Sequence, residues 1–472
     1  MKNLKMNYVT LENRLLEYGK GETYPLHMPG HKRQKEIDYN LPVAIDITEI
    51  EGFDNLHNPK GILYEAEKRA TEIYGVKRSY YLVNGSTSGV LSAISACNNE
   101  DDKILVARNC HKSVYNAAML NKLNVEYIYP NFVSGTDIWG GLTEKDIPEK
   151  KYKSVVITSP SYEGVISNVK AIAEKVHSNG GLLIIDEAHG AHLKFLDEFP
   201  ESAVECGADI VVQSAHKTLP SLTQTAFLHV CTDRVDIERL EFFLAIYQSS
   251  SPSYVLMSSL DKCVDYIINN RVAFSNYEKL LGKVRKELKN LKNFTLLEKQ
   301  VGLDNIYEYD PGKLVIISNK KDIRGIDIAK KLRETYKLEC EMAGPDYVIA
   351  MTSVMDTREG LYRLVNALKE MDKAVEIDCA NKIIRPVRIP KAVVRTSIQK
   401  ALNSSNTEIM LAEAKGRISC EFVYAYPPGS PILLPGEEIT EDVLSLIDYY
   451  RAVSLEICGA RRLEEGIIKV VN

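Results

Sequence analysis

The sequence LLIIDEAHGAH occupies residues 182–192 and carries the clearest signal for the fold. Its first four residues are apolar, as in a buried strand, and they lead directly into the acidic Asp186. Further along the chain, the apolar run 210–212 leads in the same way into a segment that contains Lys217. Because ligands in open α/β sheets bind at the carboxyl ends of the strands, we expect Asp186 and Lys217 to lie at one functional edge of a sheet.

The regions on both sides of this stretch alternate in the same way between short apolar runs and helix-like segments. Strands are predicted at 80–83, 103–106, 154–157, 182–185, 210–212 and 226–228, and helices at 61–74, 89–97 and 170–179. This alternation is typical of a mostly parallel sheet with crossover helices, so the sequence predicts an α/β fold with a doubly wound core.

Two smaller units are expected after this core. A polar helix pattern covers residues 276–292, and it is followed by a strand at 314–318, a helix at 325–336, an extended stretch at 347–352 and a helix at 357–371. A proline-containing segment at 384–390 opens the last part of the chain. We expect an N-terminal segment and large domain at 1–300, a small α+β domain at 301–375 and a C-terminal α+β domain at 376–472.

Composition excludes several classes of protein. The 472 residues are 45% hydrophobic and 26% charged, close to globular averages and unlike collagen-like or disordered chains. The 59 basic and 64 acidic residues leave a net charge of -5, which gives no reason to expect nucleic-acid binding. No apolar run approaches the roughly 20 residues of a membrane span, residues 1–14 lack the apolar core of a signal peptide, and the nine cysteines form no CxxC pair. We therefore expect a cytoplasmic protein with reduced thiols.

A glycine- and hydroxyl-rich segment, NGSTSG, occupies residues 84–89 directly after a predicted strand. Two glycines enclose Ser86, Thr87 and Ser88, and a helix of small residues follows. Backbone N–H groups at a helix start and nearby hydroxyls can bind a phosphate. A serine-rich helix cap is the structural alternative, and this segment alone does not decide between them.

The acidic segment and the lysine each have alternative interpretations. The letters DEAH at 186–189 also occur in nucleotide-driven helicases, but those enzymes need a GxxxxGK[ST] loop, which is absent from the sequence. His189 and His192 could bind a metal together with Asp186, although histidines without a metal are commoner. Lys217 by itself could be a solvated loop residue. If it is desolvated or lies near another cation, its pKa falls and its neutral amine can attack a carbonyl group.

Three groups occur together in this sequence: an anion-binding loop, an acid, and a lysine 31 residues after that acid (217 − 186 = 31). Their combination limits which cofactor the site could bind. Pyridoxal 5'-phosphate (PLP) needs these three groups: the loop for its phosphate, Lys217 for its aldehyde and Asp186 for its ring nitrogen. Opposite charges about 4 Å apart interact by roughly 4 kcal/mol at an effective dielectric near 20, or about three pKa units. A carboxylate there would keep the ring protonated, so that a bond to the α-carbon of an amino acid can break.

Nearly the whole chain resembles the short form of the bacterial Orn/Lys/Arg decarboxylase family, PLP-dependent enzymes of the aspartate aminotransferase fold (fold type I). The resemblance is carried, in order, by LHMPGHK (26–32), DNLHNP (54–59) with Gly61, NGSTSG (84–89), NCHKS (109–113), DEAHGAH (186–192), SAHKTLP (214–220) and YPPG (426–429). It implies decarboxylation of a basic L-amino acid to its amine and CO2.

The family pattern also implies residue roles. Lys217 would carry the cofactor, Asp186 would pair with its ring nitrogen and His111 would stack on the ring, with His216 as a further catalytic residue. The phosphate would be bound by Ser86, Thr87, Ser88 and Ser214, and His189 and His216 would lie beside the cofactor. Ser250 resembles the place where a neighbouring subunit reaches the phosphate, which implies a homodimer or tetramer with shared active sites. No metal is expected.

The substrate is less well defined by the sequence. Short relatives of this kind are often arginine decarboxylases that serve polyamine synthesis, so the resemblance favours conversion of arginine to agmatine. Lysine and ornithine remain alternatives, as does an aminotransferase or other lyase on the same fold. Asp54, Glu437 and Glu438 lie near family motifs and are candidates for binding the cationic side chain.

Overall fold

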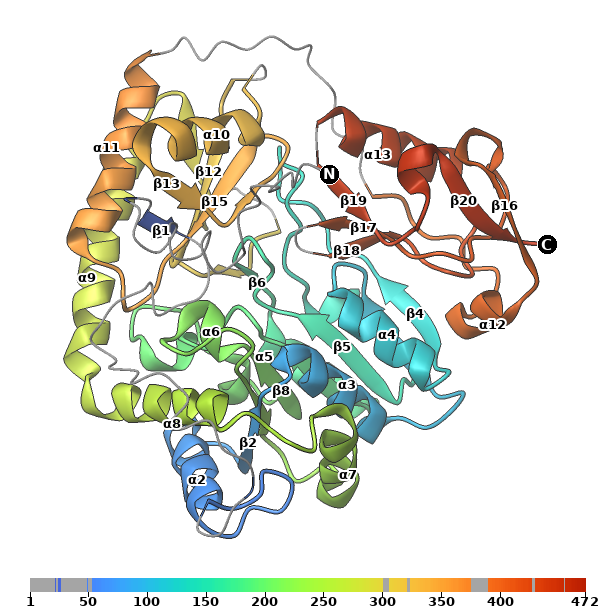
Figure 1. Cartoon of the computed structure of the whole chain (residues 1–472), viewed down its shortest axis with the longest axis horizontal. Coiled ribbons are helices and arrows are strands. Elements are labelled where there is room, and N and C mark those ends of the chain that lie inside the picture. The colour runs from blue at the N-terminus through green and yellow to red at the C-terminus, as the bar shows by residue number, and fades with distance from the viewer. Residues whose placement is uncertain are drawn as a thin grey trace, which may run out of the picture.

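The computed structural model describes residues 22, 24–26, 49, 53–299, 305–320, 323–374, 389–426, 429–453 and 455–472. Two predicted motifs therefore lie partly outside the described residues: positions 27–32 of the first motif, and Pro427 and Pro428 of the last. The described chain forms a large unit, a second unit built on its own sheet, and a C-terminal unit (Figure 1). No helix in these ranges is long and apolar enough to cross a membrane.

A seven-stranded sheet in the order β2-β9-β8-β7-β5-β3-β4 forms the centre of the large unit. The strands are β2 (Arg78–Leu82), β3 (Lys103–Ala107), β4 (Asn124–Ile128), β5 (Ser154–Thr158), β7 (Leu182–Asp186), β8 (Ile210–Gln213) and β9 (Ala226–Val230). Parallel ladders join β4, β3, β5, β7 and β8, whereas β9 runs antiparallel to β8 and β2. This arrangement confirms the predicted α/β fold with a mostly parallel sheet.

Helices of the large unit connect and cover these strands. They are α2 (Ile62–Tyr74), α3 (Gly85–Cys97), α4 (Lys112–Leu120), α5 (Val169–Ser178), α6 (Ala215–Thr218), α7 (Ile237–Tyr247) and α8 (Tyr254–Asn269). Helix α3 packs tightly on the sheet, since a Cβ atom at Gly89 would lie 2.5 Å from Leu82 and 2.9 Å from Val212.

One local prediction was wrong. The segment 84–89 is not a loop before the helix, because α3 already begins at Gly85. Ser88 stabilises this first turn by donating its hydroxyl to the Gly85 carbonyl over 2.8 Å. The three hydroxyl residues therefore lie in the first turn of a helix, where backbone N–H groups have no partner within the helix.

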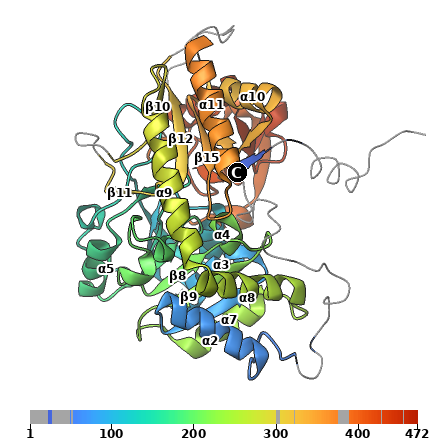
Figure 2. The same ribbon diagram turned by 90° about the vertical axis from the view of Figure 1, so that its left-hand side faces the viewer.

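The second unit contains an antiparallel sheet in the order β10-β12-β15-β14. Its elements are α9 (Arg271–Leu288), β10 (Phe294–Leu296), β12 (Lys313–Ser318), α10 (Gly325–Tyr336), β14 (Met342–Ala343), β15 (Tyr347–Met351) and α11 (Arg358–Ala374), with β13 (Leu338–Cys340) paired to β1 (Tyr24–Leu26). The long helix starts at Arg271 rather than at residue 276. Helices α9 and α11 run side by side (Figures 1 and 2), and a two-stranded ladder of β6 (Val165–Ile166) with β11 (Glu308–Tyr309) ties this unit to the large one.

The C-terminal unit has its own apolar core, formed by residues such as Val423, Leu446 and Ile468. Its elements are α12 (Ile398–Asn403), β16 (Asn406–Met410), β17 (Val423–Tyr426), β18 (Ser430–Leu433), α13 (Glu441–Ala452), β19 (Glu456–Cys458) and β20 (Ile467–Val471). The predicted division into domains at 1–300, 301–375 and 376–472 stays a prediction.

Candidate active site

A cavity of about 370 Å³ lies where the three units meet. The large unit contributes residues that follow β2, β3, β5, β7 and β8, so the cavity lies at the carboxyl edge of the parallel sheet. Met342 and Tyr347 reach it from the second unit, and Ala425 and Tyr449 from the C-terminal unit. Of the ten site residues expected from the sequence, eight line this cavity: Ser86, Thr87, His111, Asp186, His189, Ser214, His216 and Lys217.

Lys217 lies in the short helix α6, directly after β8. Its Nζ atom is 3.0 Å from Nε2 of His189. Burial lowers the pKa of Lys217, and the carboxylates of Asp186 and Glu341 oppose this effect in part. The amine is thereby brought closer to its neutral form, which is the form that attacks a carbonyl carbon.

Asp186 is the last residue of β7 and is almost fully buried. Burial raises the pKa of its carboxyl group, while the nearby Lys217 and the Ala188 N–H lower it. The Ala188 N–H donates to Oδ1 over 3.1 Å and so fixes the carboxyl group. A buried acid held in this way is suited to pair with a cationic group that enters the cavity.

Some polar atoms that line the cavity lack partners. Ser214 Oγ and Asn109 Oδ1 are buried and make no hydrogen bond within the described part of the chain. Leaving such groups unpaired costs about 1–3 kcal/mol each, so they indicate that a polar ligand belongs here. Ser88 is different, because its hydroxyl is used inside α3 and does not line the cavity.

Three histidines surround the cavity in their neutral form. Burial lowers the pKa of His111 and His216 to about 4, and that of His189 also falls well below its usual range. His111 caps α4, where its Nδ1 accepts the Ser113 N–H over 3.2 Å. His216 Nδ1 lies 2.9 Å from the Thr225 carbonyl. Hydrogen bonds to the protein therefore hold the rings of His111 and His216.

Ser250 does not line the cavity and is exposed. Its neighbour Ser249 donates its N–H to Asn84 Oδ1 over 3.2 Å, which places this loop beside the start of α3. The expected role of Ser250 across a subunit interface stays a prediction.

The three acidic candidates for the substrate side chain do not line the cavity either. Asp54 accepts backbone N–H groups of its own loop, and Glu438 forms an ion pair with Arg395. Glu437 is buried against Arg108 with oxygen–nitrogen distances of 2.5 and 2.9 Å.

Sequence reasoning missed another group of cavity residues. Asp137 and Glu163 bring carboxylates to the wall, and the rings of Phe132 and Trp139 stack with centroids 4.2 Å apart. These residues come from connections between strands, where no strand or helix pattern marks them. The single tryptophan of the chain was the one available signal. In the described ranges, no group of three or more His, Cys, Asp or Glu residues could hold a metal ion.

Comparisons with known proteins find one enzyme family along most of this chain. A family model for the Orn/Lys/Arg decarboxylase major domain matches residues 10–314, and one for the C-terminal domain of the same family matches residues 378–457. The arginine decarboxylase of Bacillus subtilis (strain 168) is 30% identical over 97% of this chain and 96% of its own length.

Solved structures show the same fold. The Francisella novicida lysine decarboxylase aligns with a TM-score of 0.75 and 18% identity, covering 98% of this chain and 80% of its own. An alanine–glyoxylate aminotransferase from Nostoc aligns with a TM-score of 0.54 and 13% identity over 67% of this chain and 88% of its own. The fold is therefore fold type I of the PLP-dependent enzymes, as predicted. Together with the two family matches, this establishes the chain as a decarboxylase that belongs to the Orn/Lys/Arg decarboxylase family.

Proposed function

We propose that this enzyme uses PLP bound at Lys217 to decarboxylate arginine to agmatine. The observation that carries the proposal is the convergence of Lys217, Asp186 and the unpaired Ser214 hydroxyl on one cavity beside the first turn of α3. Each group is of the type that one end of PLP requires.

The cavity fits the cofactor. Ser86, Thr87 and Ser214 offer hydroxyls, and the first turn of α3 offers backbone N–H groups, for a phosphate. Asp186 offers a buried carboxylate for the ring nitrogen. When bound there, PLP withdraws electrons from the α-carbon of an amino acid, so that its carboxylate can leave as CO2.

The protein's own groups control protons and orientation around this step. Nζ of Lys217, brought toward the neutral form by burial, can take up the proton that the α-ammonium group of the substrate releases and deliver it to the α-carbon after CO2 has left. His111 stays neutral and is fixed by Ser113, so its ring can lie against a cationic ring without charge repulsion. Fixing the ring plane selects which bond at the α-carbon breaks.

The cavity wall is suited to bind a cationic side chain of the substrate. Asp137 and Glu163 offer carboxylates, while the stacked Phe132 and Trp139 offer aromatic surface. A guanidinium group combines hydrogen bonding to carboxylates with stacking on aromatic rings better than an ammonium group does. Relatives named arginine decarboxylase also favour arginine over lysine or ornithine.

We further propose that the active enzyme is a homodimer, alone or within a tetramer. Phe242 and Ile246 are 61% and 53% exposed and lie one turn apart on α7, so they form an apolar patch on one face of this helix. Packing α7 against a second copy would cover them. The exposed loop with Ser250 follows α7 directly, so such packing would bring it close to the partner subunit.

Product analysis tests the proposed reaction. Purified enzyme supplied with PLP is incubated with arginine, lysine or ornithine in the absence of a keto acid. We expect agmatine and CO2 as the main products. In the resting enzyme, borohydride reduction should convert the imine at Lys217 into a stable PLP adduct. Lys217→Ala should lose the adduct and at least about 10³-fold in kcat. Cadaverine or putrescine as the main product would reassign the substrate, and a requirement for a keto acid would favour an aminotransferase.

A further inference from the structure

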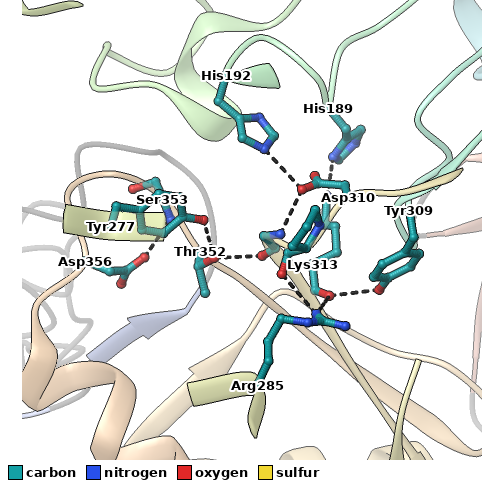
Figure 3. A network of polar contacts seen from close by, with 12 residues as sticks. His189, His192, Tyr277, Arg285, Tyr309, Asp310, Lys313, Thr352, Ser353 and Asp356 are labelled. Carbon is teal, nitrogen blue, oxygen red and sulfur yellow. Dashed lines mark hydrogen bonds and ion pairs between the residues drawn. The ribbon is translucent and has the colours of Figure 1, made fainter. Parts of the chain in front are cut away.

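Lys313 is a buried lysine that reaches the active site from the second unit. It is the first residue of β12 and is 1% exposed. Its Nζ atom lies 2.6 Å from Nδ1 of His189 (Figure 3). Since the other ring nitrogen of His189 is 3.0 Å from Nζ of Lys217, this imidazole lies between two lysine nitrogens.

The numbers of hydrogen-bond donors and acceptors limit the protonation states that Lys217, His189 and Lys313 can have together. A neutral imidazole has one N–H donor and one acceptor nitrogen, whereas a lysine ammonium group can only donate. His189 is neutral, because burial and the two lysines lower its pKa well below the usual range. It cannot accept hydrogen bonds from two ammonium groups, so one of the two lysines must be a neutral amine that accepts the imidazole N–H.

The surroundings favour the positive charge on Lys313. The carboxylates of Asp310, Glu341 and Glu163 act on its ammonium group, and its Nζ lies 5.4 Å from the centre of the Tyr162 ring. Burial lowers the pKa of Lys313 to about 8, so the group stays mainly protonated at neutral pH.

Asp310 is itself kept charged. Its Oδ1 lies 3.2 Å from His192 Nε2 and accepts the Gly312 N–H over 2.8 Å (Figure 3). His192 and Lys313 lower the pKa of the Asp310 carboxyl group in spite of its burial.

The remaining ionisable neighbours act on Lys217 or on His189, and Glu341 acts on both lysines. Asp186 and Glu341 act on Lys217, and His111 and His216 face His189. Of the two carboxylates, the proposed function assigns Asp186 to the cofactor ring. Both histidines are neutral, with pKa values of about 4.

Lys313 has little freedom to move away from His189. Its N–H donates to the Asp310 carbonyl over 3.1 Å, and its own carbonyl accepts the Tyr309 hydroxyl over 2.8 Å. Gly164 lies so close that a Cβ atom there would be 2.7 Å from Cγ of Lys313. The ammonium group is therefore positioned by the backbone as well as by its partners.

We propose that Lys313 is a positioning residue that sets the tautomer of His189. Its ammonium group donates to Nδ1, which puts the imidazole proton on Nε2, and this proton is donated to Nζ of Lys217. Lys217 is thereby held as the neutral amine. This inference rests on the proposed role of Lys217 as the amine that binds the cofactor.

The pKa of Lys217 in the full-length protein freed of cofactor tests the inference. Competitive labelling with acetic anhydride across a pH series, read by peptide mass spectrometry, gives this pKa directly. Lys313→Met should raise it by about one unit or more, because a cation near Nζ and the donor from Nε2 are both lost. Lys313→Arg keeps a cation and should keep the pKa close to the wild-type value. Lys330→Met, at an exposed lysine of α10, is the matched control and should change nothing.

An unchanged Lys217 pKa in folded Lys313→Met protein would overturn the proposal. If the variants do not fold, neutron diffraction of the wild-type protein tests the proposal. We expect a hydrogen on Nε2 of His189 and none on Nδ1. The reverse arrangement would contradict the proposal. If borohydride reduction leaves no PLP adduct on wild-type Lys217, the proposed function is refuted instead. Failure of this inference and failure of the proposed function can therefore be told apart.

Discussion

At the scale of single residues, Asp186 offers the sharpest test of the proposed chemistry. Asp186→Asn keeps the size of the side chain but removes its charge, so the cofactor ring would no longer be held protonated. An interaction of roughly 4 kcal/mol corresponds to about 10³ in rate, and we expect kcat to fall by up to that factor. Steady-state decarboxylation assays measure it, and pH titration of the cofactor absorbance reports the ring directly.

Glu187→Gln is the matched control for this variant. Glu187 is the adjacent buried acid, but its oxygens accept hydrogen bonds from Ser202, Ala203 and Gln213 rather than facing the cavity. We expect it to affect stability more than kcat. Equal losses of kcat in both variants would show that a buried charge in general, rather than Asp186 at the ring, supports catalysis.

Residues directly after buried strands were the ones that sequence could predict. Asp186 and Lys217 are within a few positions of β7 and β8, so the strand pattern alone places them at the cavity. Lys313 lies at the start of β12 rather than after the end of a strand, and it approaches His189 through the packing of the second unit. Asp137 and Glu163 come from irregular connections. Such contacts depend on tertiary packing, which no local pattern encodes.

At the scale of elements, the packing of α2 on β2 depends on a buried acid. Glu67 in α2 is 5% exposed and accepts the Tyr81 N–H over 3.0 Å, and burial raises its pKa to about 8. The unfolded chain releases this proton above about pH 4.5, whereas the folded protein keeps it. The free energy of unfolding should therefore fall by up to about 4 kcal/mol between pH 5 and pH 8.

Glu67→Gln should remove most of this fall and stabilise the protein at pH 8. Urea denaturation at several pH values measures the effect. Glu72→Gln, at an exposed acid of the same helix, should leave the pH dependence as it is in the wild-type protein. The hypothesis fails if both variants show the wild-type slope.

Strands with a uniform environment were predicted well, and a strand with a mixed one was not. The strands β5, β7 and β8 are buried along their length and read as apolar runs. Strand β4 lies at the sheet edge, is buried only at Ile128, and alternates in polarity, so it was missed. The start of α3 was missed because Gly and Ser favour loops in general, although they suit the first turn of a helix.

At the scale of the whole molecule, a buried ion pair helps to join the C-terminal unit to the large unit. Arg108 follows β3, Glu437 belongs to the C-terminal unit, and their side chains are 1% and 3% exposed. Removing one partner leaves a buried charge unpaired, so Glu437→Ala should lower the free energy of unfolding by about 3–5 kcal/mol. Glu438→Ala breaks the neighbouring, more exposed pair with Arg395 and should cost less than about 1 kcal/mol. Chemical denaturation compares the two, and equal losses would contradict this role of the Arg108 pair.

The assembly of two chains is the remaining question at this scale. Helices α2, α7 and α8 lie at the lower end of the molecule in both views (Figures 1 and 2). Replacing Phe242 and Ile246 of α7 by serine removes exposed apolar surface and should leave the fold of one chain intact. We expect sedimentation velocity to show a species of 53.0 kDa in place of a dimer, together with weaker PLP binding, because the proposed contact of Ser250 with a partner's phosphate would be lost. Ile326→Ser, at an exposed apolar residue of α10, should preserve the dimer. A dimer that persists in the double variant would place the interface elsewhere and remove the argument for Ser250.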